Sequence, residues 1–214
     1  MSDLTVKNLD LSAILAGFRQ IFDFSVPAGS CMGITGPSGI GKSVLLKALA
    51  DMIPHKGKIF LGDVESQTIS APQWRRRVAL LPADSQWWCE TVGEHFQYFD
   101  NTLFSSLGFQ EEVLDWQINH LSSGEKQRLA CIRVLLNKPE ALLLDEPTAN
   151  LDKVNREKLE LLIADYQSKH QVPVLWISHD NKQLARVSQY LLTMNTGKYE
   201  VRQTTATQAV GVEP

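Results

Sequence analysis

Residues 36–43 follow the pattern G-x-x-x-x-G-K-[ST], and they read Gly36-Pro37-Ser38-Gly39-Ile40-Gly41-Lys42-Ser43. Glycines let a backbone curl until successive N–H groups converge on one anion. Lys42 would add a mobile positive charge for the β- and γ-phosphates of a nucleotide, and the Ser43 hydroxyl would bind Mg²⁺. The segment therefore predicts a phosphate-binding loop.

The sequence on either side of this loop supports that interpretation. Residues 31–35 form a short apolar run, which is typical of a buried parallel strand. Residues 43–51 carry apolar side chains at helical spacing, so Ser43 and Val44 would open a helix. The phosphates would then lie at a helix N-terminus, where N–H groups and the helix dipole favour anions. A Gly-rich turn without function is the alternative, and the order strand, loop, Lys-Ser and helix argues against it.

A second motif precedes a predicted helix in the middle of the chain. The segment 121–128 reads Leu-Ser-Ser-Gly-Glu-Lys-Gln-Arg, and apolar residues follow at helical spacing until Pro139 ends the pattern. Ser122 or Ser123 would cap this helix and leave N–H groups available for an anion. By itself the motif indicates no more than a well-capped helix.

Two carboxylates end the apolar strand that comes next. Residues 141–147 read Ala-Leu-Leu-Leu-Asp-Glu-Pro. Asp145 would help to hold Mg²⁺ through water, and Glu146 would orient or polarise an attacking water molecule. Asp152 follows a few residues later, and His179 follows a further apolar strand at 174–177.

Together, these motifs resemble the ATPase subunits of ATP-binding-cassette (ABC) transporters over residues 4–201. In that resemblance, residues 36–43 correspond to the Walker A loop, 121–125 to the signature and 142–145 to Walker B. Glu146 corresponds to the catalytic glutamate, Asp152 to the D-loop and His179 to the switch histidine that contacts the γ-phosphate.

The resemblance implies ATP and Mg²⁺ as cofactors and a homodimer that forms with ATP. Each ATP would lie between the Walker A loop of one chain and the signature of the other, and catalysis would use Lys42, Glu146 and His179. Nucleotide contacts would come from residues 36–44 and from Ser122, Ser123, Gly124, Glu125 and Asp152, and the metal would be held by Ser43 and Asp145. A separate transmembrane permease subunit would be the partner, with no nucleic acid. The alternative is a soluble ABC ATPase that acts on a nucleic-acid or protein assembly without transport.

The chain departs from the family pattern in three places. Ser123 replaces the first signature glycine, which keeps the N–H group and adds a hydroxyl. The position of the Q-loop glutamine holds Ala83, with Asp84 and Gln86 as the nearest polar replacements. No aromatic residue is obvious for stacking on adenine, since Leu11 lies near that position and Phe18 is the nearest aromatic.

Composition agrees with a cytosolic protein. The 214 residues carry a net charge of −3, which does not favour binding of polyanions. The three cysteines are widely spaced and fall mostly in apolar runs, so we interpret them as reduced core residues. We find neither an apolar signal region nor a stretch of membrane-spanning length, and we expect a cytoplasmic protein peripheral on the inner face of the membrane.

Alternation of short apolar strands with helical segments predicts an α/β fold with a mainly parallel sheet. The family resemblance specifies it as a P-loop NTPase core with a small antiparallel β subdomain and a helical lobe. We expect one domain over residues 1–202, with the lobe at about 91–136, and a disordered tail at 203–214. Residues 154–169 form an amphipathic pattern.

Two tryptophan-containing segments have competing interpretations. Trp74 and the three arginines after it resemble a basic patch, but a solvated helix end explains them better. Trp87 and Trp88 fit either core packing or the family's docking site for a membrane subunit. The chain size and short lobe also resemble compact bacterial cassettes that are paired with metal (iron) exporters.

Overall fold

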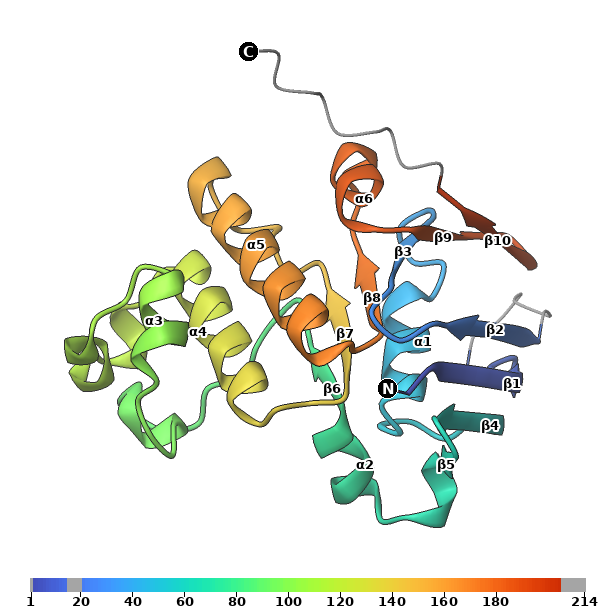
Figure 1. Cartoon of the computed structure of the whole chain (residues 1–214), viewed down its shortest axis with the longest axis horizontal. Helices are drawn as coiled ribbons and strands as arrows, with labels where there is room; N and C mark the ends of the chain where they lie inside the picture. Colours follow the sequence, from blue (N-terminus) through green and yellow to red (C-terminus); the bar gives the residue numbers. More distant parts are fainter. Residues whose placement is uncertain (1, 15–20, 205–214) are drawn as a thin grey trace.

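A computed structural model describes residues 2–14 and 21–204 of this protein. A six-stranded sheet lies at the centre, a four-stranded sheet lies on one side of it, and a helical lobe lies on the other (Figure 1). In chain order the strands and α-helices are β1 (Leu4–Asp10), β2 (Phe22–Val26), β3 (Cys31–Thr35), α1 (Lys42–Leu49), β4 (Lys56–Leu61), β5 (Val64–Glu65), α2 (Ala71–Arg77), β6 (Val78–Leu81), α3 (Asn101–Ser106), α4 (Ser123–Leu136), β7 (Ala141–Asp145), α5 (Lys153–His170), β8 (Val174–Ile177), α6 (Asn181–Val187), β9 (Tyr190–Asn195) and β10 (Lys198–Gln203).

The central sheet has the strand order β10-β9-β3-β8-β7-β6. Every neighbouring pair is parallel except β10 with β9, which form an antiparallel hairpin. Side chains alternate between the two faces, so on β7 Leu143 packs into one core cluster and Leu142 and Leu144 pack into the other. The predicted α/β fold with a mainly parallel sheet is confirmed.

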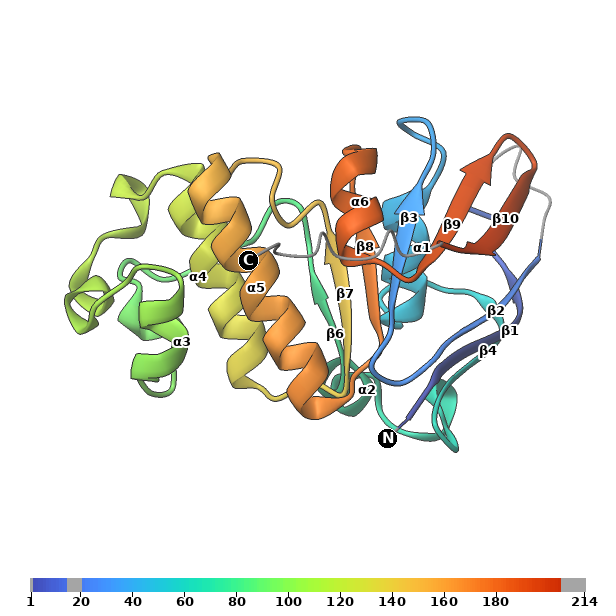
Figure 2. The same ribbon diagram turned by 45° about the horizontal axis from the view of Figure 1, so that its top comes forward.

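Helices cover both faces of this sheet. Leu45 and Leu46 of α1 and Trp74 of α2 belong to the core cluster on one face. Leu129 of α4 and Leu159 of α5 belong to the cluster on the opposite face, and Figure 2 shows α5 and α6 in front of the central sheet. A parallel sheet that is buried on both faces explains why its strands are almost wholly apolar.

The second sheet has the order β2-β1-β4-β5 and is antiparallel throughout. Leu4 and Val6 of β1 are buried and share a core cluster with residues of α1, while Thr5 between them is more exposed. This sheet is the small antiparallel subdomain that the family resemblance implied.

The helical lobe contains less α-helix than the sequence predicts. Within residues 91–122, all of which the structure describes, only α3 is an α-helix, and three short 3-10 helices (Gly93–His95, Glu111–Asp115 and Ile118–His120) lie on either side of it. Asp100 starts α3 by accepting from the N–H of Leu103 at 3.0 Å, and Gly108, with φ of 83°, ends its last turn. Because Asp100 and Gly108 confine α3 to six residues, the expected extent of helix was wrong.

Hydrogen-bonded structure continues two residues past the predicted domain boundary at residue 202. Gln203 pairs with Tyr190 in β10, and Thr204 donates its N–H to the carbonyl oxygen of Gln189 at 2.8 Å. Because these bonds continue the sheet, Gln203 and Thr204 do not belong to the tail expected at 203–214. Its remaining residues, 205–214, lie outside the described residues.

Two of the three arginines after Trp74 make hydrogen bonds or ion pairs within the fold. Trp74 is fully buried, and its indole N–H donates to the carbonyl oxygen of Leu49 at 2.9 Å. Arg75 donates to the carbonyl oxygen of Asp51 at 2.8 Å, and Arg77 pairs with a carboxylate near the start of β7. A helix end is therefore the correct interpretation of this segment.

Candidate functional site

The loop between β3 and α1 has the glycines that its backbone requires. A Cβ on Gly36 would collide with the carbonyl oxygen of Met194 on β9. Gly39 and Gly41 have φ of 77° and 107°, values that L-residues rarely adopt. Pro37, Ser38 and Gly39 are exposed, and a Cβ on Gly39 would meet no atom within 4 Å. The loop is thus anchored to the sheet at its base and open at its tip, as binding of an anion requires.

Lys42 closes this loop from the first turn of α1. Its Nζ donates to the carbonyl oxygens of Gly36 and Pro37 at 2.9 and 3.0 Å, and only 6% of the residue is exposed. Burial lowers the pKa of Lys42, while the nearby charges of Glu146 and Asp145 act in the opposite direction. The ammonium group therefore lies in the concave side of the loop within the field of two carboxylates.

Those carboxylates stand at the carboxyl end of β7. Asp145 is buried and lies opposite Ile177 of β8. Glu146 has φ of 47°, a left-handed conformation that costs about 1–3 kcal/mol in a non-glycine residue and is frequent at functional sites. Its backbone N–H donates to the carbonyl oxygen of Ile177 at 3.2 Å, which turns the Glu146 side chain off the strand end.

His179 follows β8 and contacts Glu146. His179 Nε2 lies 2.9 Å from Glu146 Oε1, across the boundary between two adjacent parallel strands. Because β3, β8 and β7 are neighbours and parallel, the loops after them leave the same edge of the sheet, at the top in Figure 2. Lys42, Glu146 and His179, predicted from three separate motifs, thus stand at one edge, where ligands of open α/β sheets bind.

Ser43 and Asp145 are the predicted metal ligands. Among the residues that the structure describes, no three His, Cys, Asp or Glu side chains group as a metal cage. Mg²⁺ typically takes one or two protein oxygens and completes its shell with water and phosphate oxygens. A hydroxyl and a carboxylate at the edge that carries the phosphate loop fit this donor chemistry.

The signature segment starts α4 with a capping box. Ser122 accepts from the N–H of Glu125 at 3.2 Å, and Glu125 Oε2 accepts from the N–H and the hydroxyl of Ser122 at 2.9 and 2.8 Å. Ser123 is exposed in the first turn. A Cβ on Gly124 would lie 3.0 Å from the carbonyl oxygen of Asn150, so the signature packs closely on the segment between β7 and α5.

Asp152 ends that segment and caps α5. Its carboxylate accepts from the backbone N–H and the side-chain amide of Asn155 at 2.9 and 2.6 Å. The backbone hydrogen bond from Asn155, followed by the side-chain bond, holds the pKa of Asp152 below its usual range. Asp152 thus lies beside the signature of its own chain. α4 packs against β6, three strands from β3 in the sheet order, so this signature does not complete the phosphate loop of the same chain.

Two of the departures from the family pattern differ in their exposure: the Q-loop segment is at the surface, and Leu11 is buried. Ala83, Asp84 and Gln86 are exposed on the segment after β6, and the carbonyl oxygen of Gln86 accepts from Arg133 at 3.0 Å. Leu11 is 1% exposed and belongs to the core under the antiparallel sheet, so it presents no face to an adenine ring. Phe18 lies outside the described residues.

The paired tryptophans differ in exposure. Trp87 is half-buried against the core, whereas 71% of Trp88 is exposed. His95 Nε2 accepts from the N–H groups of Trp88 and Cys89 at 3.0 and 3.1 Å. The Arg133 guanidinium lies 4.5 and 4.9 Å from the two indole rings. Trp88 is therefore an exposed aromatic side chain on a firmly held backbone.

Trp88 lies at the rim of a groove of about 440 Å³ between α2 and α4. The lining includes Met52, which is 52% exposed, and the guanidinium groups of Arg75, Arg76 and Arg133. No acidic residue is among the lining residues. The groove is therefore apolar at its base and positively charged at its edge.

A buried polar network beside Glu146 and His179 is not apparent from the sequence. Gln183 of α6 is hydrogen-bonded to Thr148, Glu160 and Ser178, and all four residues are buried. In the sequence, a Gln and a Glu inside helices look like ordinary surface residues. Only the folded chain brings them next to the candidate site.

Comparison with known proteins identifies related chains. The family model described as "ABC transporter" matches residues 20–149. The "Probable iron export ATP-binding protein FetA" of Escherichia coli K12 is 32% identical over 200 residues, which cover 85% of this chain and 86% of that protein. "Energy-coupling factor transporter ATP-binding protein EcfA2" of Caldanaerobacter subterraneus subsp. tengcongensis is 29% identical, over 84% of this chain and 69% of that protein.

Two further comparisons cover larger proteins. "Molybdenum import ATP-binding protein ModC" of Rhodopseudomonas palustris strain HaA2 is 30% identical, over 86% of this chain and 53% of that protein. The fold resembles the solved "Structure of a bacterial Atm1-family ABC exporter with ATP bound", with a TM-score of 0.81 and 22% identity over 96% of this chain and 39% of that one.

Proposed function

The chain belongs to the ABC transporter family. We propose that it hydrolyses ATP as one half of a head-to-tail dimer, and that this hydrolysis drives a separate membrane subunit. ATP binding and hydrolysis follow from the family and from its named ATP-binding relatives. Those relatives include both importers and exporters, so the direction of transport depends on the membrane subunit.

The contact between Glu146 and His179 carries the proposal for the chemistry. Glu146 would orient and polarise the attacking water, and His179 would contact the γ-phosphate while its ring holds the Glu146 carboxylate in place. Lys42 would leave its carbonyl partners in the loop to bind the β- and γ-phosphates. Mg²⁺, held by Ser43 and Asp145, would neutralise charge on the phosphate oxygens.

The distance between the signature and the phosphate loop supports a dimer. Ser122, Ser123 and Gly124 start a helix three strands away from β3, and the first turn of such a helix is suited to an anion. A second copy, turned head to tail, would bring this helix start over the first copy's phosphate loop. The same contact would then occur twice, which closes a two-fold dimer around two ATP molecules.

The groove beside Trp88 is the proposed docking site for the membrane subunit. An exposed tryptophan on a rigid backbone is the type of side chain that dominates interface energies. Among the described residues, no helix is both long and apolar enough to cross a bilayer. We propose that the protein binds a permease chain through this groove and so lies at the inner face of the membrane.

Substitution of Glu146 by Gln tests the proposed chemistry. The amide keeps the size of the side chain and removes its basicity, so turnover should fall by about two orders of magnitude or more. ATP should still bind, and light scattering should detect an ATP-dependent dimer of this variant. Glu112→Gln, an exposed change in the lobe, is the matched control. Normal steady-state hydrolysis by Glu146→Gln would reject the assignment.

Substitution of Trp88 tests the docking site. Trp88→Ala removes an exposed ring, so the melting temperature should stay within a few degrees while co-purification of the membrane subunit is lost. Trp87→Ala is the contrasting variant, because it removes half-buried core contacts and should lower the melting temperature. Unchanged partner binding by Trp88→Ala would place the docking surface elsewhere.

A further inference from the structure

We propose that Gln183 is a positioning residue for ATP hydrolysis, because its side-chain amide links the loop that carries Glu146 to the loop that carries His179. The inference rests on the roles proposed above for those two residues. Gln183 itself touches neither nucleotide nor the reacting water in this arrangement, and it acts through its hydrogen bonds to the two loops.

The Gln183 amide is held on both sides. Its Oε1 accepts from the Ser178 hydroxyl at 2.7 Å. Its Nε2 donates to the Thr148 hydroxyl at 2.8 Å and to Glu160 Oε1 at 2.7 Å. Gln183 is 1% exposed, so water does not compete for these bonds, and breaking one would leave a buried polar group unpaired.

These partners lie next to the catalytic side chains in sequence. Ser178 directly precedes His179, and Thr148 lies two residues after Glu146. The Ser178 hydroxyl also accepts from the N–H of Asp180 at 3.0 Å, which fixes the backbone on the other side of His179. The 2.9 Å contact between Glu146 and His179 therefore depends on two loops that Gln183 holds together.

The orientation of the amide is set by charge. Glu160 projects from α5 and is 8% exposed, and it accepts from Arg186 Nε and from a terminal guanidinium nitrogen at 2.9 and 2.8 Å. Hydrogen bonding to Glu160 raises the pKa of Arg186, as expected for a firm ion pair. An ionised carboxylate only accepts hydrogen bonds, so it must face the NH₂ group of Gln183, and this turns the amide oxygen toward Ser178.

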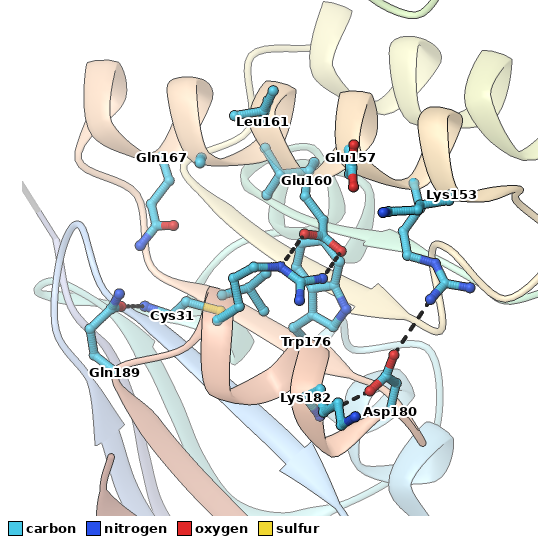
Figure 3. A pocket seen from close by; sticks show the side chains of 15 residues that line it. Cys31, Lys153, Glu157, Glu160, Leu161, Gln167, Trp176, Asp180, Lys182 and Gln189 are labelled. Atoms are coloured by element: carbon cyan, nitrogen blue, oxygen red, sulfur yellow. Dashed lines mark hydrogen bonds and ion pairs between the residues drawn. The ribbon is translucent and has the colours of Figure 1, made fainter. Parts of the chain in front are cut away.

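The outer side of the network borders a cavity of about 740 Å³ between α5 and α6. Figure 3 shows Glu160 and Trp176 at this cavity, with the guanidinium bonds to Glu160 drawn as dashed lines. At the far end of the cavity, Asp180 pairs with Arg156 at 3.4 Å and caps α6. The Arg156–Asp180 ion pair and the Gln183–Glu160 hydrogen bond both join α5 to the segment that begins at His179. Of these two residue pairs, only the one with Gln183 also reaches the Glu146 loop, through Thr148.

Because Gln183 donates to a carboxylate, a substitution of the same size at position 183 can break this hydrogen bond. Gln183→Glu would place a carboxylate at hydrogen-bond distance from the Glu160 carboxylate, inside the protein. Two buried carboxylates so close cannot both be ionised without strong repulsion. In the double variant Gln183→Glu with Glu160→Gln, the NH₂ group of residue 160 would donate to the new carboxylate, and its amide oxygen would still accept from Arg186 Nε. The terminal nitrogen of Arg186 that Glu160 Oε1 now holds would turn to solvent, since this side chain is 54% exposed.

The experiment measures steady-state ATP hydrolysis and nucleotide affinity of the full chain. Gln183→Glu should lower kcat about 10- to 100-fold, the scale for misplacing a catalytic group by about 1 Å, with KM for ATP changed less than about threefold. The double variant should recover kcat to within about threefold of the wild type. Acidification from pH 8 to pH 6 should raise the activity of Gln183→Glu relative to wild type, because one proton relieves the repulsion.

Controls separate this inference from the proposed function. Gln110→Glu makes the same change on the exposed surface and should leave kcat unchanged. If His179→Ala and Glu146→Gln lose turnover but Gln183→Glu does not, only the role of Gln183 is overturned. Glu160→Gln is also measured alone. If the double variant shows the summed losses of Gln183→Glu and Glu160→Gln, the link between residues 183 and 160 is overturned as well. If His179→Ala hydrolyses ATP normally, the proposed function itself is wrong, and the inference fails with it.

Discussion

Substitution of Gly124 by Ala should show how closely the signature helix depends on the segment beside it. The new Cβ would lie 3.0 Å from the carbonyl oxygen of Asn150 and 3.3 Å from a methyl carbon of Leu151. The methyl group can move aside. The carbonyl oxygen belongs to a turn that is fixed by bonds from Ala149 to Glu146 and from Leu151 to Thr148, each 3.2 Å long.

Two opposing effects determine the size of the change. Replacing Gly by Ala in a helix stabilises it by up to about 1 kcal/mol. Overpacking against a fixed backbone costs about 1–3 kcal/mol. The steric effect should win by about 1 kcal/mol, which lowers the melting temperature of a domain of this size by about 2–4 °C.

The matched control is Ser123→Ala, one position earlier on the same helix turn. Ser123 is exposed, so this variant gains helix propensity without a clash and should be more stable by about 0.5 kcal/mol. Thermal unfolding without nucleotide should therefore separate the two alanine variants by about 3–6 °C. If Gly124→Ala melts at or above Ser123→Ala, the close packing of signature on turn does not constrain position 124.

Two further predictions concern other parts of the chain. Arg77 donates to Glu140 at 2.6 and 2.9 Å, and these hydrogen bonds lower the pKa of Glu140 from 4.5. A depressed carboxyl pKa stabilises the fold above the unfolded value, so Glu140→Gln should cost less than about 1 kcal/mol at pH 7, and thermal unfolding should show this difference fade as the pH falls below 4.5. In the assembled complex, Ala83→Gln should raise Mg²⁺-dependent ATPase activity and Gln86→Ala should not change it, since three extended residues span up to about 10 Å; loss of activity in Gln86→Ala would show that a displaced glutamine replaces the missing one.

Local motifs carried most of the information about the fold and the nucleotide chemistry. Residues 36–43 predicted a loop between a buried strand and a helix, and the structure has that loop between β3 and α1. The spacing at 154–169 predicted a helix, observed as α5, because an amphipathic face depends only on positions within one segment. The extent of helix in the lobe was overestimated, because short apolar runs there pack as 3-10 turns rather than as continuous helix.

The tertiary structure alone decided which of these side chains meet. Glu146 and His179 are far apart in sequence, and they touch because β7 and β8 are neighbours with parallel register. Leu11 lies in the core because it shares a cluster with residues of α1 and of the antiparallel sheet, a long-range association that its own sequence neighbours do not encode. The network around Gln183 joins four segments through hydrogen bonds shorter than 3 Å. A motif is recognisable when its function depends on local backbone geometry, whereas these contacts depend on strand order and helix packing, which the whole chain determines together.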